Sequence, residues 1–135
     1  MEIKTSITGQ EFYDLRHSVG WKDAKVSQLE TALKNSMTIV GIYEGSEIVA
    51  MGRIVGDYSF KALLSDIIVF PKYQGKGYGK LVVKKLIEIT KEKMNVGDIL
   101  CIEGSPTKGN LEFYLKCGFK HKPEIQDGIY LWLEK

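Results

Sequence analysis

Apolar residues recur along the chain with two different spacings, and the spacing predicts which segments are helices and which are strands. Between residues 8 and 34 the apolar positions return every three or four residues, which predicts two amphipathic helices. Thr8 is the predicted cap of the first helix, because Glu11 follows it at the spacing of a capping box. Val26, Leu29 and Leu33 form the apolar stripe of the second. A short strand over residues 3–7 is predicted before both helices.

The middle of the chain is strand-like, with a turn at residues 44–46 between strands expected over residues 37–43 and 48–55. The most strand-like run covers residues 62–70 and ends at Pro71. A helix is then expected over residues 77–94, with Val82, Leu86 and Ile89 on its buried stripe. The remaining elements expected are a strand over residues 99–103, a helix over residues 110–117 that Gly118 stops, an extended segment from Phe119 onward, and a closing strand over residues 129–133.

This order of elements predicts an α+β fold in which helices flank a mixed sheet. No repeat and no linker divides the 135 residues, so residues 1–135 are expected to form a single domain. A formal net charge of +2 argues against a dedicated nucleic-acid binder. The first residues lack the apolar core of a signal peptide, and no apolar run has membrane-spanning length. Two cysteines outside any C-x-x-C pair and two histidines favour a reduced cytoplasmic protein without a metal site.

A glycine-rich turn carries the first chemical signal, in the sequence Gln74-Gly75-Lys76-Gly77-Tyr78-Gly79. It joins the strand-like run to the start of a helix, whose first N–H groups have no partner within the helix. Glycines allow a phosphate to approach these groups closely, and Lys76 and Lys80 add positive charge. A dinucleotide-binding turn would need a third glycine at Lys80, and a P-loop would need Ser or Thr at Leu81. A tight turn without a ligand is the alternative.

The pattern that fits is Gln74-x-x-Gly77-x-Gly79, which resembles the acetyl-CoA pyrophosphate loop of the Gcn5-related N-acetyltransferase (GNAT) superfamily. Residues 66–71, Asp-Ile-Ile-Val-Phe-Pro, resemble the central strand of that superfamily, and residues 110–119 resemble its second motif. The resemblance covers roughly the C-terminal half. It extends to the small arylalkylamine N-acetyltransferases of plants and bacteria, through Ser65-Asp66-Ile67-Ile68-Val69.

The resemblance implies a mostly antiparallel sheet of about six or seven strands, with a splayed central pair at residues 62–70 and 99–103 and about four flanking helices. It implies acetyl-CoA as co-substrate, with the pantetheine arm along the backbone of the first splayed strand as an added strand would lie. A backbone N–H at a bulge in that strand would then serve as oxyanion donor. The residues expected to bind acetyl-CoA are Ile68, Val69, Phe70, Gln74, Gly75, Lys76, Gly77, Tyr78, Gly79, Lys80, Asn110 and Tyr114.

The catalytic residues expected are Tyr114 and Asp66. Tyr114 shares a helix face with Asn110, and the resemblance implies that it protonates, or hydrogen-bonds to, the sulfur of CoA. Asp66 is expected on the strand face of Leu64 and Ile68, where burial would make it a base. It could instead hold a loop or attract the cationic amine. Glu103 and a water relay are the other candidates for the base.

Direct attack of an amine on the thioester, with no acyl-enzyme, is the expected chemistry. A small amine is the expected acceptor, and a protein lysine, a protein N-terminus or a non-catalytic acyl-CoA-binding module are the alternatives. A homodimer is compatible with the sequence, whereas nucleic acid and membrane are not expected as partners. Arg53 is expected in an ion pair and Asp57 in a turn. Aromatic residues of the first two helices are weaker candidates for the acceptor pocket: Phe12, Tyr13, His17 and Trp21.

Overall fold

Two helices near the N-terminus begin and pack as the apolar pattern predicts. In the computed structural model, which describes residues 1–135, α1 (Gly9–Ser18) starts after Thr8. The Glu11 N–H donates to Thr8 Oγ1 over 3.0 Å, and the Thr8 N–H donates to Glu11 Oε1 over 2.9 Å. The predicted capping box is therefore confirmed. Leu29 and Leu33 are the buried residues of α2 (Val26–Lys34), which packs against α1.

The strands form one seven-stranded sheet in the order β1-β2-β3-β4-β5-β7-β6. Every neighbouring pair is antiparallel except β4 and β5, which run parallel. The mixed, mostly antiparallel sheet expected from the sequence is thus confirmed. The strands are β1 (Glu2–Lys4), β2 (Thr38–Glu44), β3 (Glu47–Gly56), β4 (Lys61–Val69), β5 (Ile99–Gly104), β6 (Lys120–His121) and β7 (Ile129–Glu134).

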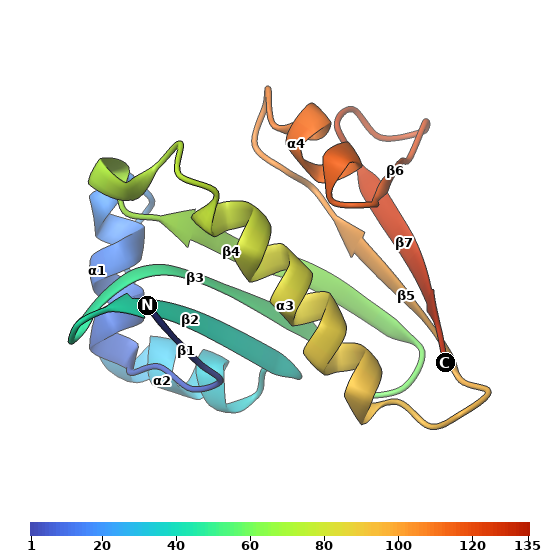
Figure 1. Cartoon of the computed structure of the whole chain (residues 1–135), viewed down its shortest axis with the longest axis horizontal. Helices are drawn as coiled ribbons and strands as arrows, with labels where there is room; N and C mark the ends of the chain where they lie inside the picture. Colours follow the sequence, from blue (N-terminus) through green and yellow to red (C-terminus); the bar gives the residue numbers. More distant parts are fainter.

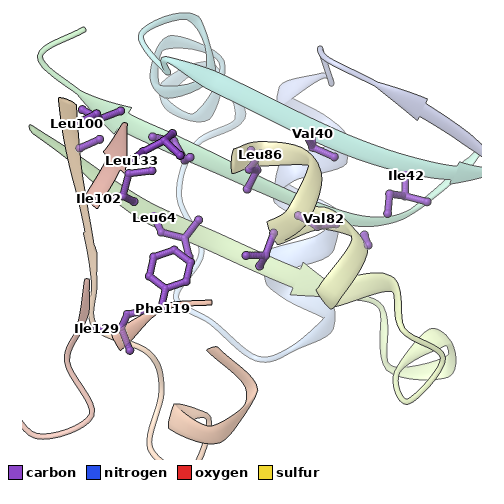
Figure 2. Close-up of a cluster of buried hydrophobic side chains, with 14 of the residues drawn as sticks. Val40, Ile42, Leu64, Val82, Leu86, Leu100, Ile102, Phe119, Ile129 and Leu133 are labelled. Atoms are coloured by element: carbon purple, nitrogen blue, oxygen red, sulfur yellow. The ribbon is translucent and has the colours of Figure 1, made fainter. Parts of the chain in front are cut away.

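Helices cover the two faces of the sheet and create two separate cores. The helix α3 (Tyr78–Lys93) crosses one face, and α1 and α2 lie on the other (Figure 1). The larger core joins Val82 and Leu86 of α3 to apolar residues of the sheet, with Phe119 inserted between Leu64 and Ile129 (Figure 2). The smaller core lies under α1 and α2 and contains Phe12, Leu15, Leu29, Leu33, Tyr43, Ile48, Met51 and Ile68.

The central strands β4 and β5 pair over three residues only and then diverge. Lys61, Ala62 and Leu63 pair with Cys101, Ile102 and Glu103, and no pairing follows. In Figure 1 the two strands separate toward the end that carries the short helix α4 (Leu111–Lys116). The second half of β4 therefore presents an unpaired edge toward β5, and the splayed pair expected from the sequence is confirmed.

A bulge in β4 reverses which side chains face which core. Ser65 pairs with Arg53 and Ile68 pairs with Met51, so that Asp66 and Ile67 together lie opposite the single residue Gly52. Asp66 has φ +54°, a conformation that is uncommon for a residue other than glycine. The extra residue interrupts the strict alternation of a strand.

The predicted position of Asp66 on a shared face of Leu64 and Ile68 is consequently wrong. Leu64 packs in the larger core under α3, whereas Ile68 packs in the smaller core under α1 and α2. Asp66 is turned toward α1, where it contacts Arg16. Simple alternation fails here because one inserted residue shifts the period of two.

Three further details differ from the sequence expectation. The first strand is β1, three residues long rather than five, and a 3₁₀ turn (Pro71–Tyr73) was not expected. On α3, Ile89 is only partly buried, and Val83 and Thr90 are buried in addition to Val82 and Leu86. No helix combines the length and apolar character needed to span a membrane.

Candidate active site

The glycine-rich turn forms the N-terminus of the longest helix. Gly75 and Gly77 have φ of +78° and +89°, and Gly77 is the N-cap residue of α3 with no side chain capping it. No atom lies within 4 Å of a Cβ built on either glycine, so this side of the turn is open. Unpartnered N–H groups and the helix dipole make such a terminus suitable for a phosphate. The turn thus fits the pyrophosphate of CoA.

Side chains of the turn are used to hold its shape. Gln74 Nε2 donates to the backbone oxygen of Val69 over 3.0 Å, which ties the turn to the end of β4. The Tyr78 hydroxyl donates to Glu44 Oε1 over 2.8 Å, which fixes α3 against β2. The side chain of Gln74 is therefore a structural tether, and the turn offers its backbone and its lysines to a ligand.

A cavity of about 590 Å³ runs from this turn to α4 along the open edge of β4. Nine of the residues predicted to bind acetyl-CoA line it, namely Val69, Gln74, Gly75, Gly77, Tyr78, Gly79, Lys80, Asn110 and Tyr114. The other lining residues are Ile67, Tyr73 and Phe113. The structure thus brings together residues from the two separate sequence motifs.

The other predicted binding residues lie outside this cavity. Ile68 is 2% exposed, and its side chain belongs to the core under α1 and α2. The Phe70 N–H donates to Val49 O over 2.9 Å, so it is used inside the sheet. Because N–H groups alternate between the two edges of a strand, the Val69 N–H faces the open edge. The side chain of Lys76 lies near the ring of Tyr73, 5.5 Å from its centre.

A second cavity, of about 340 Å³, lies between the diverging strands. Its wall contains Trp21, Ser65 and Asp66, together with residues 104–107 at the end of β5 and in the loop that follows. Ile67, Asn110 and Tyr114 line this cavity and the first one as well. The two cavities therefore meet at these three residues.

Tyr114 lies at this junction on α4, held by aromatic neighbours. Its ring packs edge-on against Phe113 and Phe119, with centroid separations of 4.9 and 6.2 Å. Burial raises the pKa of the Tyr114 hydroxyl to about 12, with a smaller contribution from Cys117. The phenol is therefore protonated at neutral pH and can donate a hydrogen bond.

Asp66 is the only charged residue in the wall of the smaller cavity, and its carboxylate is fully engaged. Arg16 Nη1 donates to Oδ1 over 3.1 Å, and Arg53 Nε donates to Oδ2 over 2.7 Å. The Ser65 hydroxyl also donates to Oδ2, over 3.0 Å. The expected ion pair of Arg53 is confirmed. To act as a base, Asp66 would have to accept a proton on an oxygen that already accepts these hydrogen bonds.

Of the remaining predicted site residues, only Trp21 lines one of the two cavities. Glu103 pairs with Lys61 and Lys122, which lower its pKa, and it lines neither of the two cavities. Asp57 accepts three backbone N–H groups in a turn, as expected, which lowers its pKa. Among the aromatic candidates Phe12 is 1% exposed in the core, and only Trp21 reaches the smaller cavity.

Two parts of the site were missed by the sequence reasoning. Arg16 is not among the predicted site residues, because its partner Asp66 lies 50 residues away in the sequence. Residues 104–107, Gly-Ser-Pro-Thr, line the smaller cavity and are also not among the predicted site residues. A cluster of Gly, Ser and Pro after a strand was the available signal for a functional loop.

Known acetyltransferases resemble this chain in sequence. The family model described as the acetyltransferase (GNAT) family matches residues 7–119. A soybean (Glycine max) relative named histone acetyltransferase TAP1 is 33% identical over 134 residues, which is 89% of this chain and 56% of the relative. GCN5-related N-acetyltransferase 2, chloroplastic, from Arabidopsis thaliana is 30% identical over 158 residues, covering 99% of this chain and 59% of that protein.

A solved structure supports the fold directly. The Bacillus subtilis acetyltransferase in complex with CoA aligns with a TM-score of 0.68, covers 99% of this chain and 98% of that one, and is 21% identical. The chain spans somewhat more than half the length of the two curated relatives above. One of these relatives is named as chloroplastic, so the predicted cytoplasmic location stays a prediction. The matched family model, together with the splayed strands and the glycine-rich turn, shows that this chain belongs to the GNAT acetyltransferase family.

Proposed function

We propose that this protein transfers an acetyl group from acetyl-CoA to a primary amine, and that the acceptor is a small molecule. The observation that carries the proposal is the meeting of two cavities at Ile67, Asn110 and Tyr114. A donor entering from the glycine-rich turn and an acceptor entering from the side of Trp21 would meet at this junction. Such an arrangement brings two reactants together in one geometry, which is a large part of catalysis.

The donor would bind through its pyrophosphate at the N-terminus of α3 and through its pantetheine arm along β4. Lys80 lines the cavity and supplies positive charge beside the turn. The Val69 N–H faces the open edge and can pair with an amide of the arm. Membership of the family and the CoA complex of a protein with the same fold support this assignment.

The amine nitrogen would attack the thioester carbon, the C–S bond would break, and CoA would leave as a thiolate. An acyl-enzyme on cysteine is disfavoured, because burial raises the pKa of Cys117 and neither cysteine lines either cavity. The attacking amine must be neutral, and an unperturbed primary amine with a pKa near 10 is only about 0.1% neutral at pH 7. Loss of its proton is therefore part of the reaction.

Tyr114 would stabilise the departing sulfur. With a pKa of about 12 for Tyr114 and about 8.5 for a thiol, complete proton transfer to the thiolate is uphill by about 5 kcal/mol. A hydrogen bond from the phenol to the thiolate lowers the barrier without that transfer. We therefore assign Tyr114 as a hydrogen-bond donor to sulfur, with the thiolate taking its proton later from water.

Asp66 is the only carboxylate in the wall of the smaller cavity and remains its candidate base. Its oxygens already accept hydrogen bonds from Arg16, Arg53 and Ser65, which favours a role in holding the site. A water relay would then remove the proton of the amine. The pH dependence of an Asp66 variant separates these two roles.

The size of the smaller cavity supports a small acceptor. A volume of about 340 Å³ falls within the usual range of small-molecule pockets. The name of the soybean relative supports a second candidate, a protein lysine, and Leu63 is 44% exposed in the wall of this cavity, where a polypeptide could lie.

The test is release of the CoA thiol from acetyl-CoA with a panel of monoamines, diamines and polyamines, and with lysine-containing peptides. The proposal predicts release that depends on a small amine and a product that carries an N-acetyl group. Turnover with peptides alone would support the second candidate. Binding of acetyl-CoA without turnover of any amine would leave a non-catalytic acyl-CoA-binding module.

A further inference from the structure

Three charged side chains form a half-buried network beneath the bulge of β4. Arg16 comes from α1, Arg53 from β3 and Asp66 from the bulge itself. The side chains of Arg16, Arg53 and Asp66 are 22%, 17% and 8% exposed, and both carboxylate oxygens are bound to guanidinium groups. Hydrogen bonds between charged groups are among the strongest in proteins. The network therefore fixes the position of Asp66 from two sides.

Each arginine also contacts a second element. Arg16 Nη2 donates to Lys22 O over 2.9 Å, and its guanidinium lies 5.4 Å from the ring centre of Trp21. Arg53 Nη1 donates to Ser36 Oγ over 3.3 Å, at the end of α2. The network thus links α1, the end of α2 and the loop that carries Trp21 to one point of β4.

The bulge needs this support. Asp66 has φ +54°, which a residue other than glycine keeps only where its surroundings hold it. The two residues Asp66 and Ile67 lie opposite Gly52 alone, so the bulge leaves a backbone N–H unpaired beside the junction of the cavities. An unpaired N–H at this point can face the oxygen of a thioester as an oxyanion donor.

We infer that Arg16 and Arg53 are positioning residues for acetyl transfer, which act through Asp66 on the bulge of β4 and through Lys22 on the wall that carries Trp21. The inference rests on the proposed function and extends it, because it assigns these arginines a part in the reaction. It also assigns Asp66 to holding the bulge rather than to accepting the proton of the amine. The arginines hold the backbone donor on one side of the junction and the acceptor wall on the other.

A double-mutant cycle tests whether the network acts as a unit. Arg16→Gln and Asp66→Asn should each lower kcat by about 10-fold to 100-fold, since a small misplacement of reacting groups costs this much. The Kd of acetyl-CoA should change by less than about 2-fold, because the glycine-rich turn is not part of the network. The double variant should be no slower than the slower single variant. If the loss of kcat in the double variant equals the product of the losses in the two single variants, the inference is overturned.

Conservative and control variants separate positioning from loss of folding. Arg16→Lys and Arg53→Lys keep the charge and should retain part of the activity that Arg16→Gln and Arg53→Gln lose. Lys61→Gln removes the interstrand ion pair with Glu103, away from both cavities, and should leave kcat unchanged. Circular dichroism should give the same spectrum for all variants. Equal losses of kcat in Lys61→Gln and Arg16→Gln would contradict the inference.

The pH profile decides between the two roles of Asp66. If Asp66 positions the bulge, Asp66→Asn lowers kcat/KM at every pH and leaves the pH of the rising limb where it is in the wild type. If Asp66 is the base, the rising limb shifts or disappears, and the inference is overturned.

Hydrogen exchange gives a readout that does not depend on turnover. In Arg16→Gln the amides of Ser65 and Ile68, the residues that pair with β3 on either side of the bulge, should exchange at least about 10-fold faster than in the wild type, while the amides of α3 are unchanged. Unchanged exchange at the bulge would overturn the inference. Faster exchange in a protein that acetylates no amine would retain the network and reject the proposed function.

Discussion

Replacing Gly77 by glutamate places a carboxylate at the N-terminus of α3, where the pyrophosphate of acetyl-CoA is proposed to bind. No atom lies within 4 Å of a Cβ built on Gly77, so the first carbon of the new side chain meets no steric obstacle in the protein. The backbone at φ +89° disfavours any residue with a Cβ, by roughly 1–2 kcal/mol. Gly77→Glu therefore combines a strain effect on the turn with a charge effect on the ligand.

The charge effect can be estimated from Coulomb's law. At a separation of about 5 Å, two unit charges repel by about 0.8 kcal/mol in water and by about 3 kcal/mol at the effective dielectric constant of a protein surface. With the two charges of the pyrophosphate, the loss of binding free energy lies between about 1.7 and about 6.6 kcal/mol. The Kd of acetyl-CoA should therefore rise by at least about 15-fold.

Titration calorimetry with acetyl-CoA measures this change, and two controls isolate its cause. Gly77→Ala carries the same backbone strain without the charge. Gly97→Glu adds the same charge at another open glycine with φ +93°, in the turn after α3, and should bind acetyl-CoA as the wild type does. The difference between Gly77→Glu and Gly77→Ala should shrink as salt is added. The Kd of acetyl-CoA should be at least about 15-fold higher for Gly77→Glu than for Gly77→Ala. If the two Kd values differ by less than about 3-fold, the turn is not the pyrophosphate site.

Three further changes test the site and its support. Lys80→Gln should weaken acetyl-CoA binding by a few-fold at low salt and by less at high salt, as calorimetry at two salt concentrations would record. Gly52→Ala would bring a Cβ to 2.6 Å from side-chain atoms of Ile67 and Val82, so urea unfolding should show a loss of about 1–3 kcal/mol. The pKa of Tyr114 is higher in the folded protein than in the unfolded chain, so the phenol of the unfolded chain loses its proton at a lower pH. The free energy of unfolding of the wild type should therefore fall by about 1 kcal/mol relative to that of Tyr114→Phe between about pH 9 and about pH 11. An equal pH dependence of unfolding in both proteins would exclude burial as the cause.

Local chemistry made much of the fold predictable from the sequence. The capping box at Thr8 and Glu11 is a contact over three residues, and the start of α1 follows from it. The glycine-rich turn is likewise local, and the positive φ of Gly75 and Gly77 is what those glycines allow. The contribution of Asn110 and Tyr114 to the same cavity followed from a resemblance, because more than 30 residues separate them from the turn in the sequence.

The long-range contacts of the site could not be predicted from the apolar pattern of the sequence. The bulge at Asp66 is set by pairing with β3 and by the arginines, and nothing in residues 61–69 alone requires an inserted residue. Arg16 also looked like an ordinary polar residue on the first helix. An ion pair between residues 50 positions apart depends on how α1 packs over the sheet, which helical periodicity cannot specify.

The central claim is that acetyl transfer takes place where the two cavities meet, with Tyr114 beside the sulfur. Its most direct test is the amine-dependent release of CoA thiol by the wild type and by Tyr114→Phe, measured together with the Kd of acetyl-CoA. Loss of one hydrogen bond to the thiolate, worth about 1.5–3 kcal/mol, should lower kcat by about 10-fold to 100-fold and leave the Kd nearly unchanged. Equal kcat values for the two proteins, or no amine-dependent release from a wild type that binds acetyl-CoA, would contradict the account.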